Sequence, residues 1–329
     1  MATIGDVAKR AGLSRATVSR VLNDHPYVSE EKKRLVHAVM DELGYVPNSI
    51  AQQLRTQTTA TIAVIIPIIS NPFFGKLVES MEKVAVENKF QLIVCQTGMD
   101  KHRELIYLDW LKTKQVGGII LASSENSWRD IHDYMNFGPI MFCNEYPKDT
   151  EAPIVCLDQF KGGYIGTRHL LERGYRRIAY CIGSSHETNI LDRKKGFEQA
   201  LAEFGVSMSD DLWFERIYDI EDGRRVFQEI YGMTSKPDAV FTNSDEVAAG
   251  MIKEAKKFGY RIPDDLAVIG FDDQPIADLM DPGITTVYQP VEDIGKKTIE
   301  LMIRYVRDNQ EPVNKVTTLP IHLVVRAST

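Results

Sequence analysis

Hydrophobic and polar positions near the N-terminus recur with helical spacing and predict three short helices. The first follows the capping pair Thr3 and Asp6 and ends at Gly12. The second spans residues 15–23, and the third spans residues 29–43 and stops before another glycine. Two short helices separated by a glycine turn have the spacing of a helix-turn-helix motif. We therefore predict a small all-α unit of this type at the start of the chain.

The second predicted helix carries polar side chains along one side, namely Arg15, Thr17, Ser19, Arg20 and Asn23. Side chains of these lengths reach base edges and phosphates in the major groove of DNA. The alternative is an ordinary solvated helix face. Because the preceding helix, the glycine turn and the capping residues all have the spacing of a helix-turn-helix motif, the pattern favours contact with DNA.

The rest of the chain alternates strand-like apolar runs with helix-like segments. The strand-like runs are 62–69, 91–97, 117–123, 139–144, 154–158, 178–183, 212–218, 238–243, 266–271, 284–289 and 319–326. The helix-like segments are 74–89, 101–115, 161–174, 190–204, 222–232, 245–259 and 292–308. Apolar strands separated by helices predict doubly wound parallel sheets, and this length suits two lobes. Ligands of such folds bind at the carboxyl ends of the strands.

Composition places the chain among globular proteins. Hydrophobic residues make up 43% of the 329 residues, which is enough for the cores of two or three domains. The longest apolar run, residues 62–69, is interrupted by Pro67 and is too short to span a membrane. The N-terminus lacks the apolar segment of a signal peptide, so we expect a cytoplasmic, nucleoid-associated protein without a membrane partner.

Cysteine and charge patterns narrow the chemistry further. Cys95, Cys143, Cys156 and Cys181 lie far apart in apolar stretches, so we expect reduced core residues, no metal and no cofactor. The net charge of −7 speaks against nucleic acid as a partner, but residues 1–60 hold eight Lys/Arg against six Asp/Glu. This excess is typical of a DNA-binding head on an acidic body, although so small a difference can also be chance.

Two long segments of the sequence point to a family. Residues 3–23, TIGDVAKRAGLSRATVSRVLN, and the continuation YVSEEKKRLVHAVMDELGYVPNSIAQQLR resemble the DNA-binding headpiece of the LacI/GalR family of bacterial transcription regulators. Segments such as IAVIIPIISNPFFGKLVESME, HLLERGYRRIAYCIG and PDAVFTNSDEVAAGMIKEAKKFGYRIPDDLAVIGFDD are similar to the family's core. The resemblance covers nearly the whole chain.

The resemblance implies an architecture. It combines an N-terminal all-α helix-turn-helix headpiece with an α/β core like that of periplasmic binding proteins, made of two doubly wound parallel-sheet lobes. The implied parts are a headpiece at 1–47, a hinge helix with linker at 48–60, and an effector-binding and dimerisation core at 61–329. The lobes would comprise roughly 61–158 plus 276–290 and 159–272 plus 291–329, with crossings near 141–160, 272–276 and 289–293.

The resemblance also implies a function: a repressor that binds a palindromic operator as a homodimer. Its bases would be read by Arg15, Ala16 and Arg20, and its phosphates contacted by Thr3, Thr17, Ser19, Asn23 and Tyr27. The hinge would contribute Asn48, Ala51, Leu54 and Arg55. Leu54 would enter the minor groove as a wedge. The alternative for Leu54 is a linker residue that rests on the core.

A small effector, a sugar or a sugar derivative, would bind between the lobes. The positions implied by the resemblance are Asn71, Phe73, Phe74, Lys161, Arg193, Ser244 and Asp272. The alternatives are a place in the core for the phenylalanines and a surface ion pair for Arg193. Asp245 reads as a helix N-cap. The family often has an acidic residue at the position of Lys161, so a lysine there favours an anionic or phosphorylated effector.

Other functions fit less well. Regulators of the catabolite-control type, which use a phosphorylated carrier protein, have a tyrosine and a basic residue where this chain has Glu292 and Glu300. A heptad tail does not follow the last strand-like run, so we expect a dimer. A solute-binding protein conflicts with the headpiece. An enzyme is not expected, because GxSxG, Walker, GxGxxG and HExxH motifs are missing.

Overall fold

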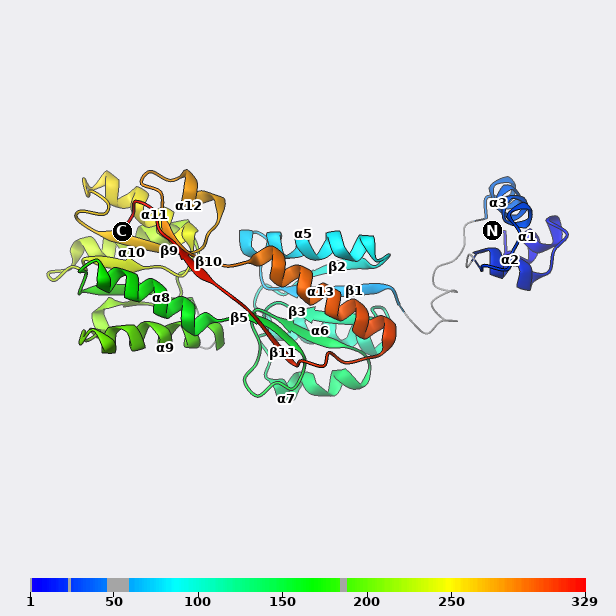
Figure 1. Cartoon of the computed structure of the whole chain (residues 1–329), viewed down its shortest axis with the longest axis horizontal. Helices are drawn as coiled ribbons and strands as arrows, with labels where there is room; N and C mark the ends of the chain where they lie inside the picture. Colours follow the sequence, from blue (N-terminus) through cyan, green and yellow to red (C-terminus); the bar gives the residue numbers. More distant parts are fainter. Residues whose placement is uncertain (1, 23–24, 46–58, 184–187) are drawn as a thin grey trace. The chain divides into compact units, whose positions relative to one another are not determined.

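The computed structural model describes residues 2–22, 25–45, 59–183 and 188–329 (Figure 1). The chain divides into two compact units, Met1–Thr58 and Thr59–Thr329, and each is described by itself.

The N-terminal unit contains helices α1 (Ile4–Arg10), α2 (Arg15–Leu22) and α3 (Glu30–Leu43), which confirms the helices predicted from the sequence. A capping box begins α1: the backbone N–H of Thr3 donates to Asp6 at 2.9 Å, and the N–H of Asp6 donates to the Thr3 hydroxyl at 3.3 Å. Gly12 turns the chain between α1 and α2 with φ +67°, a conformation that favours glycine.

A small apolar core joins these helices. Its buried members are Val7, Ala8, Val18, Val21, Val36, Val39 and Met40. They recur along each helix at intervals of three and four residues or lie next to one another, so each helix turns one stripe inward. The opposite sides of the helices remain in solvent and are available for a partner.

The first lobe of the larger unit is built on a parallel sheet with strand order β11-β5-β4-β3-β1-β2. Its strands are β1 (Thr61–Ile66), β2 (Gln91–Gln96), β3 (Gly118–Leu121), β4 (Ile140–Cys143), β5 (Ile154–Leu157) and β11 (Val316–Leu319). Its helical segments are α5 (Pro72–Glu87), α6 (Lys101–Lys112), α7 (Trp128–Ile131), η1 (His132–Asn136) and α13 (Val291–Asp308).

Alternate residues of β1 enter cores on opposite faces of this sheet, which is why the strand reads as a continuous apolar run. Ile62, Val64 and Ile66 pack in the core beneath α5 and α13, whereas Ala63 and Ile65 pack in the core beneath α6. Figure 1 shows α5 and α13 side by side over the sheet, and these two helices contact each other extensively.

The second lobe has the strand order β12-β10-β9-β8-β6-β7, in which only β12 pairs antiparallel among the described strands. Its strands are β6 (Ile178–Cys181), β7 (Trp213–Phe214), β8 (Ala239–Phe241), β9 (Ala267–Asp272), β10 (Thr285–Tyr288) and β12 (His322–Val324). Its helical segments are α8 (Gln159–Glu172), α9 (Thr188–Glu203), η2 (Asp210–Leu212), α10 (Ile220–Gly232), α11 (Asp245–Lys257) and α12 (Pro275–Leu279). Helices α8 and α9 pack as a pair, and so do α10 and α11.

The strand pairing corrects the expected division of the lobes. In the described core the chain crosses between lobes at 157–159, 288–291 and 319–322, not at 272–276. Residues 276–290 belong to the second lobe, because α12 returns the chain to the same sheet and β10 pairs with β9. Helix α13 and β11 belong to the first lobe, where α13 packs on α5 and β11 pairs with β5.

The predicted strand-like run 319–326 is in fact shared between the sheets. Pro320 separates β11 from β12 and has no N–H to donate to a ladder, so the run breaks there. Figure 1 shows this last segment passing from one lobe to the other. The short elements α7, η1, η2 and α12 were not predicted, because so few residues show no clear period.

The four cysteines are buried and unpaired, and they lie in or beside strands of the two sheets. None of the described helices is long and apolar enough to cross a lipid bilayer.

Candidate functional sites

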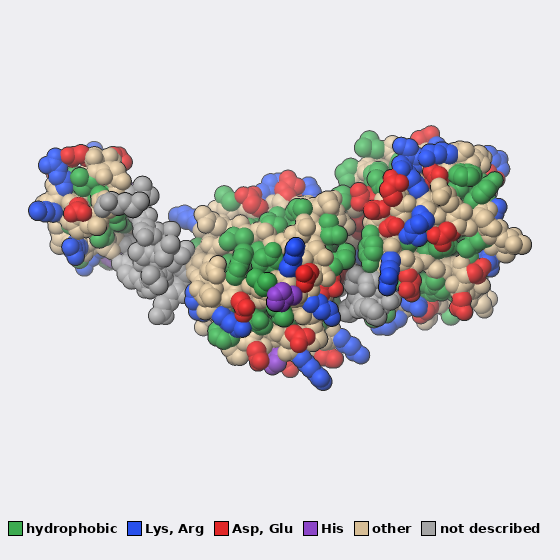
Figure 2. Space-filling model, turned by 180° about the vertical axis from the view of Figure 1, so that it is seen from behind, with side chains coloured by type: hydrophobic (Ala, Val, Ile, Leu, Met, Phe, Trp, Pro, Cys, Tyr) green, Lys and Arg blue, Asp and Glu red, His purple; other side chains and the backbone are tan. Residues whose placement is uncertain are grey.

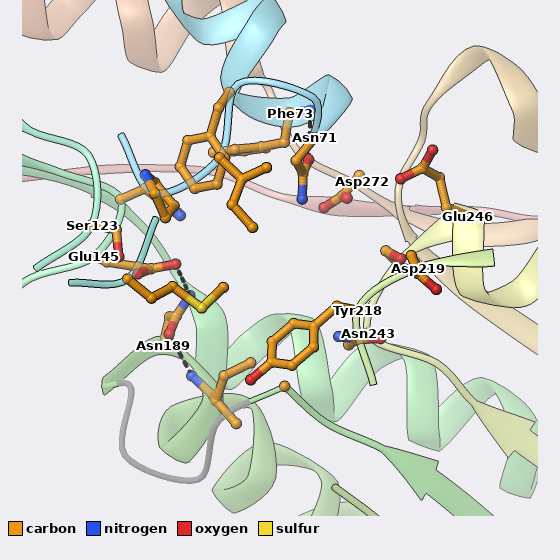
Figure 3. Close-up of a pocket in the computed structure, with 18 of the residues that line it drawn as sticks. Asn71, Phe73, Ser123, Glu145, Asn189, Tyr218, Asp219, Asn243, Glu246 and Asp272 are labelled. Carbon is orange, nitrogen blue, oxygen red and sulfur yellow. Dashed lines mark hydrogen bonds between the residues drawn. The ribbon is translucent and has the colours of Figure 1, made fainter. Parts of the chain in front are cut away.

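A pocket of about 390 Å³ lies between the lobes (Figure 3). Residues that follow the carboxyl ends of strands in both sheets form its walls, as expected for doubly wound folds. Its volume is in the range of small-molecule sites.

The first lobe supplies one wall of the pocket. Asn71 follows β1 and caps α5, since its side chain accepts a hydrogen bond from the N–H of Phe73 at 2.9 Å. This cap sets the start of α5 and thereby the place of Phe73, whose ring meets Phe74 edge-on at 5.2 Å. The loops that follow β3 and β4 add Ser123 and Glu145 to this wall.

The second lobe supplies the facing wall. Arg193 and Asn189 come from α9, Tyr218 follows β7, and Ser244 and Asp272 come from the ends of β8 and β9. Ser244 is the N-cap of α11, because its side chain accepts from the N–H of Val247. The expected N-cap, Asp245, is instead the first residue of that helix.

A hydrogen-bonded network of side chains links the floor of the pocket to the crossing segments. Arg193 donates from Nε to Gln159 Oε1 at 2.6 Å. Gln159 in turn donates to Asn144 at 3.2 Å and to Gln289 at 3.4 Å, and Gln289 donates to Asp272. Gln159 and Gln289 lie where the chain crosses between lobes, so this network connects the pocket with two of the crossing segments.

Arg193 is held in a fixed position. Its side chain is only 6% exposed, and its guanidinium lies 3.6 Å from the centroid of the Phe271 ring. Close packing of α8 on α9 places it there: a Cβ on Gly163 would lie 2.0 Å from the Arg193 carbonyl oxygen. A surface ion pair, the alternative considered from the sequence, does not describe this buried side chain.

Asp272 combines burial with an unusual backbone. Its φ of +104° is strained for a residue other than glycine, and such strain persists only where the surroundings enforce it. Burial raises the pKa of its carboxyl to about 6, although Arg193 and hydrogen bonds from Gln289 and Gln274 oppose the shift. This carboxyl group lines the pocket.

Further carboxylates surround the pocket. Glu145 accepts a hydrogen bond from Asn189 Nδ2 at 3.0 Å, and burial raises its pKa. Burial also raises the pKa of Glu125 and of Glu246, with neighbouring carboxylates adding to both shifts. Behind the wall, fully buried Asp245 accepts from the N–H of Gln274 at 2.7 Å, and burial next to Asp272 raises its pKa to about 8.

The structure brings together most of the residues named for the effector site: Asn71, Phe73, Phe74, Arg193, Ser244 and Asp272 line the pocket. Lys161 does not. Its side chain is exposed on the first turn of α8, and its N–H donates to Asp158 at 2.9 Å, so the expectation of an anionic effector loses its basis.

Several lining residues were not found from the sequence. They include Glu125, Glu145, Asn189, Asn243, Glu246 and Gln289. Each lies in a loop that follows a strand or in the first turn of a helix, so a signal existed in the rule that loops at carboxyl strand ends carry the site. Which of these side chains face the cleft depends on tertiary packing.

In the N-terminal unit, helix α2 exposes Arg15, Ala16 and Arg20, whereas Thr17 and Ser19 are half-buried. Arg15 lies over α1, because a Cβ on Gly5 would come within 2.6 Å of its guanidinium. Thr3 is engaged in the capping box, and its hydrogen bonds lower the pKa of Asp6. Tyr27 follows α2 and is 91% exposed.

The remaining predicted DNA contacts, Asn23, Asn48, Ala51, Leu54 and Arg55, lie outside the described residues, as does most of the predicted hinge at 48–60. These residues stay predictions.

The fold and sites define a class: a two-lobed small-molecule-binding core joined to a helix-turn-helix unit. Residues 3–48 match the family model of bacterial regulatory proteins, lacI family, and residues 167–329 match the periplasmic binding protein-like domain. The chain is 40% identical to the NTD biosynthesis operon regulator NtdR of Bacillus subtilis (strain 168), with 100% of both chains covered. The chain therefore belongs to the lacI family, and it is a DNA-binding transcription regulator, not an enzyme.

Solved structures agree with this assignment. A complex of the transcriptional regulator CelR with cellobiose matches with a TM-score of 0.73 and 27% identity, covering 100% of both chains. The lac repressor dimer bound to operator matches with a TM-score of 0.88, covering 99% of this chain and 98% of that one, and at 23% identity it shows the shared fold.

Proposed function

We propose that this regulator is a repressor that binds a two-fold symmetric operator as a homodimer in the cytoplasm, and that a small polyhydroxylated effector in the interlobe pocket changes its operator affinity. The observation that carries the proposal is the pocket: polar groups of both lobes converge on it, and a network reaches from it to the crossing segments.

Contact with DNA is assigned to the exposed side of α2. Arg15, Ala16 and Arg20 are exposed on this helix and would face base edges, and Thr3, Thr17, Ser19 and Tyr27 would approach phosphates. Arginine is suited to bidentate contact with guanine, and small Ala16 allows close approach of the helix.

Effector binding is assigned to the pocket. Asn71, Ser244, Arg193 and Asp272 offer donors and acceptors for hydroxyl groups, and Phe73 offers an apolar face. CelR, which shares the fold over its whole length, is solved with cellobiose. Because the lining comes from both lobes, an effector would favour one degree of lobe closure over another, which is the differential affinity that allostery requires.

Homodimerisation is assigned to the first lobe. Edge strand β2 and helix α6 expose large apolar side chains, among them Val94 at 41% and Ile106 at 46%. Figure 2 shows hydrophobic side chains gathered on one face of this lobe. An exposed edge strand with an apolar neighbour is a typical association surface.

Selection of DNA from a random-sequence library by the purified full-length chain tests the proposal. We expect the selected sequences to share an inverted repeat. Arg20→Ala should weaken binding to that repeat by roughly tenfold to a hundredfold and relax the preference at one base pair of each half-site.

Arg129→Ala is the matched control, because it removes the same charge from an exposed helix of the core. It should leave the selected sequence unchanged. Selection of sequences without an inverted repeat, or an equal effect of both substitutions, would contradict the proposal.

A further inference from the structure

The lining of the pocket has more acidic than basic residues. Among the described lining residues, Glu125, Glu145, Asp219, Glu246 and Asp272 are acidic, whereas Arg193 is the one basic residue. Arg193 is already engaged by Gln159 and by the face of Phe271. One basic side chain therefore faces five acidic side chains in this lining.

These carboxylates occupy opposite ends of the pocket. Figure 3 shows Glu145 beside Ser123 at one end and Asp272, Glu246 and Asp219 at the other. The first end belongs to the loops after β3 and β4 in the first lobe, and the second end to the second lobe. Closure of the lobes would bring these carboxyl groups toward each other, and keeping them ionised would cost free energy unless a cation lies between them.

Aromatic rings complete the arrangement. Phe73 and Tyr218 lie on facing sides of the pocket in Figure 3, with the carboxylates at its ends. Rings placed in this way stack on the faces of a saccharide, and they also attract a cation. The amide oxygen of Asn243 is buried and has no hydrogen-bond partner among the described residues, so it can accept from an N–H or O–H group of the ligand.

We infer that the effector is a polyhydroxylated amine, such as an amino sugar, whose ammonium group binds a carboxylate at an end of the pocket. This inference rests on the proposed function and names the class of its effector. Carboxylates at both ends suit a ligand with an ammonium group at each end. Neutral sugars lack the charge that would stabilise closure, and phosphorylated sugars would face repulsion from the lining.

Calorimetric titration of the full-length chain with matched sugars tests this inference. The pairs are glucosamine with glucose, galactosamine with galactose, and a diamino-disaccharide with its neutral parent; glucose 6-phosphate serves as the anionic probe. We expect at least one amino sugar to bind roughly tenfold or more tightly than its neutral counterpart, because a charged hydrogen bond replaces a neutral one.

Substitutions in the pocket show which carboxyl groups produce the preference for amino sugars. Glu145→Gln and Glu246→Gln each remove one carboxyl group from an end of the pocket. At least one of them should reduce the preference for the amino sugar over its neutral counterpart to about threefold or less. Glu82→Gln removes a charge from the exposed side of α5 and should leave this preference unchanged. The wild-type comparison needs no variant, so the inference stays testable if a variant fails to fold.

Tighter binding of neutral or phosphorylated sugars than of their amino counterparts would overturn the inference, and so would a panel in which no amino sugar binds. Either result leaves operator selection, and with it the proposed function, unaffected. Failure of operator selection with a normal amino-sugar preference would instead reject the proposed function and keep the ligand class.

Discussion

At the scale of single residues, the pocket is made of groups that are costly to bury. Arg193 and Asp272 are nearly inaccessible to solvent, and Asp245 behind them is fully buried. Ionised groups in such surroundings need partners, and here the partners are glutamine side chains at the lobe crossings. The same glutamines connect the binding site to the segments that must move when the lobes change their angle.

Asp245 should make stability depend on pH. Its pKa is raised to about 8, so the folded protein holds this proton at pH values where the unfolded chain has lost it. The contribution of this proton to the free energy of unfolding is complete below pH 4, near the pKa of aspartate in the unfolded chain. It is lost as the pH rises toward 8, the pKa in the folded protein. Asp245→Asn removes the titration, so the stability of the wild type relative to this variant should fall from pH 5 to pH 9.

Urea unfolding of both proteins across this range measures the difference, which we expect to change by a few kcal/mol, on the order of the shift itself. Asp308→Asn, at the exposed end of α13, is the matched control. A constant difference between the wild type and Asp245→Asn across the range would show that the buried carboxyl does not titrate as inferred.

Single residues were predictable where a family motif or a strand end marked them. Phe73, Arg193 and Asp272 follow from such signals, and all of them line the pocket. Glu145 and Asn189 did not follow, because they meet only when the end of β4 and the start of α9 face each other across the cleft. Lys161 was named from a family position, but its side chain is exposed on the first turn of α8 and does not line the pocket.

At the scale of elements, glycines set the spacing of α8 and α9. A Cβ on Gly163 would lie 2.0 Å from the Arg193 carbonyl, and a Cβ on Gly196 would lie 1.9 Å from the Phe160 carbonyl. These distances are too short for any side chain, so the two helices pack backbone to backbone. The contact fixes α9 and the pocket residues that it carries.

Gly163→Ala should therefore force the helices apart. We expect a loss of about 1–3 kcal/mol in the free energy of unfolding, the range for overpacking, together with weaker effector binding because Arg193 moves. Gly232→Ala at the end of α10 meets open space and should be neutral or slightly stabilising. Equal stability of both variants in urea unfolding would rule out the close packing as a constraint.

Most elements of the core were predictable from periodicity, because its buried parallel strands read as apolar runs between amphipathic helices. The division of the lobes was not. The family resemblance led us to expect a crossing at 272–276, at the end of β9, yet α12 and β10 continue the same lobe and β10 pairs with β9. Only pairing between distant strands decides this, and local sequence does not encode it.

At the scale of the whole molecule, the proposed dimer depends on the apolar surface of β2 and α6. Ile106→Glu should place a charge in that surface and convert the dimer to a monomer at micromolar concentration, seen by sedimentation velocity. Operator affinity should fall at the same time, since one headpiece contacts a single half-site.

Val313→Glu is the matched control, because this residue is fully exposed in the loop after α13. It should remain a dimer. A wild-type chain that sediments as a monomer at these concentrations would contradict the proposed dimer. An Ile106→Glu variant that remains a dimer would place the interface elsewhere.

Occupancy of the pocket should change the affinity of the headpiece for DNA. Fluorescence anisotropy of a selected operator fragment tests it most directly, with and without a small-molecule extract of cells that carry this gene. For the wild type, the extract should change operator affinity about fivefold or more. Arg193→Gln should bind the operator but no longer respond. An operator affinity that the extract leaves unchanged, or an undiminished response of Arg193→Gln, would contradict this coupling between pocket and headpiece.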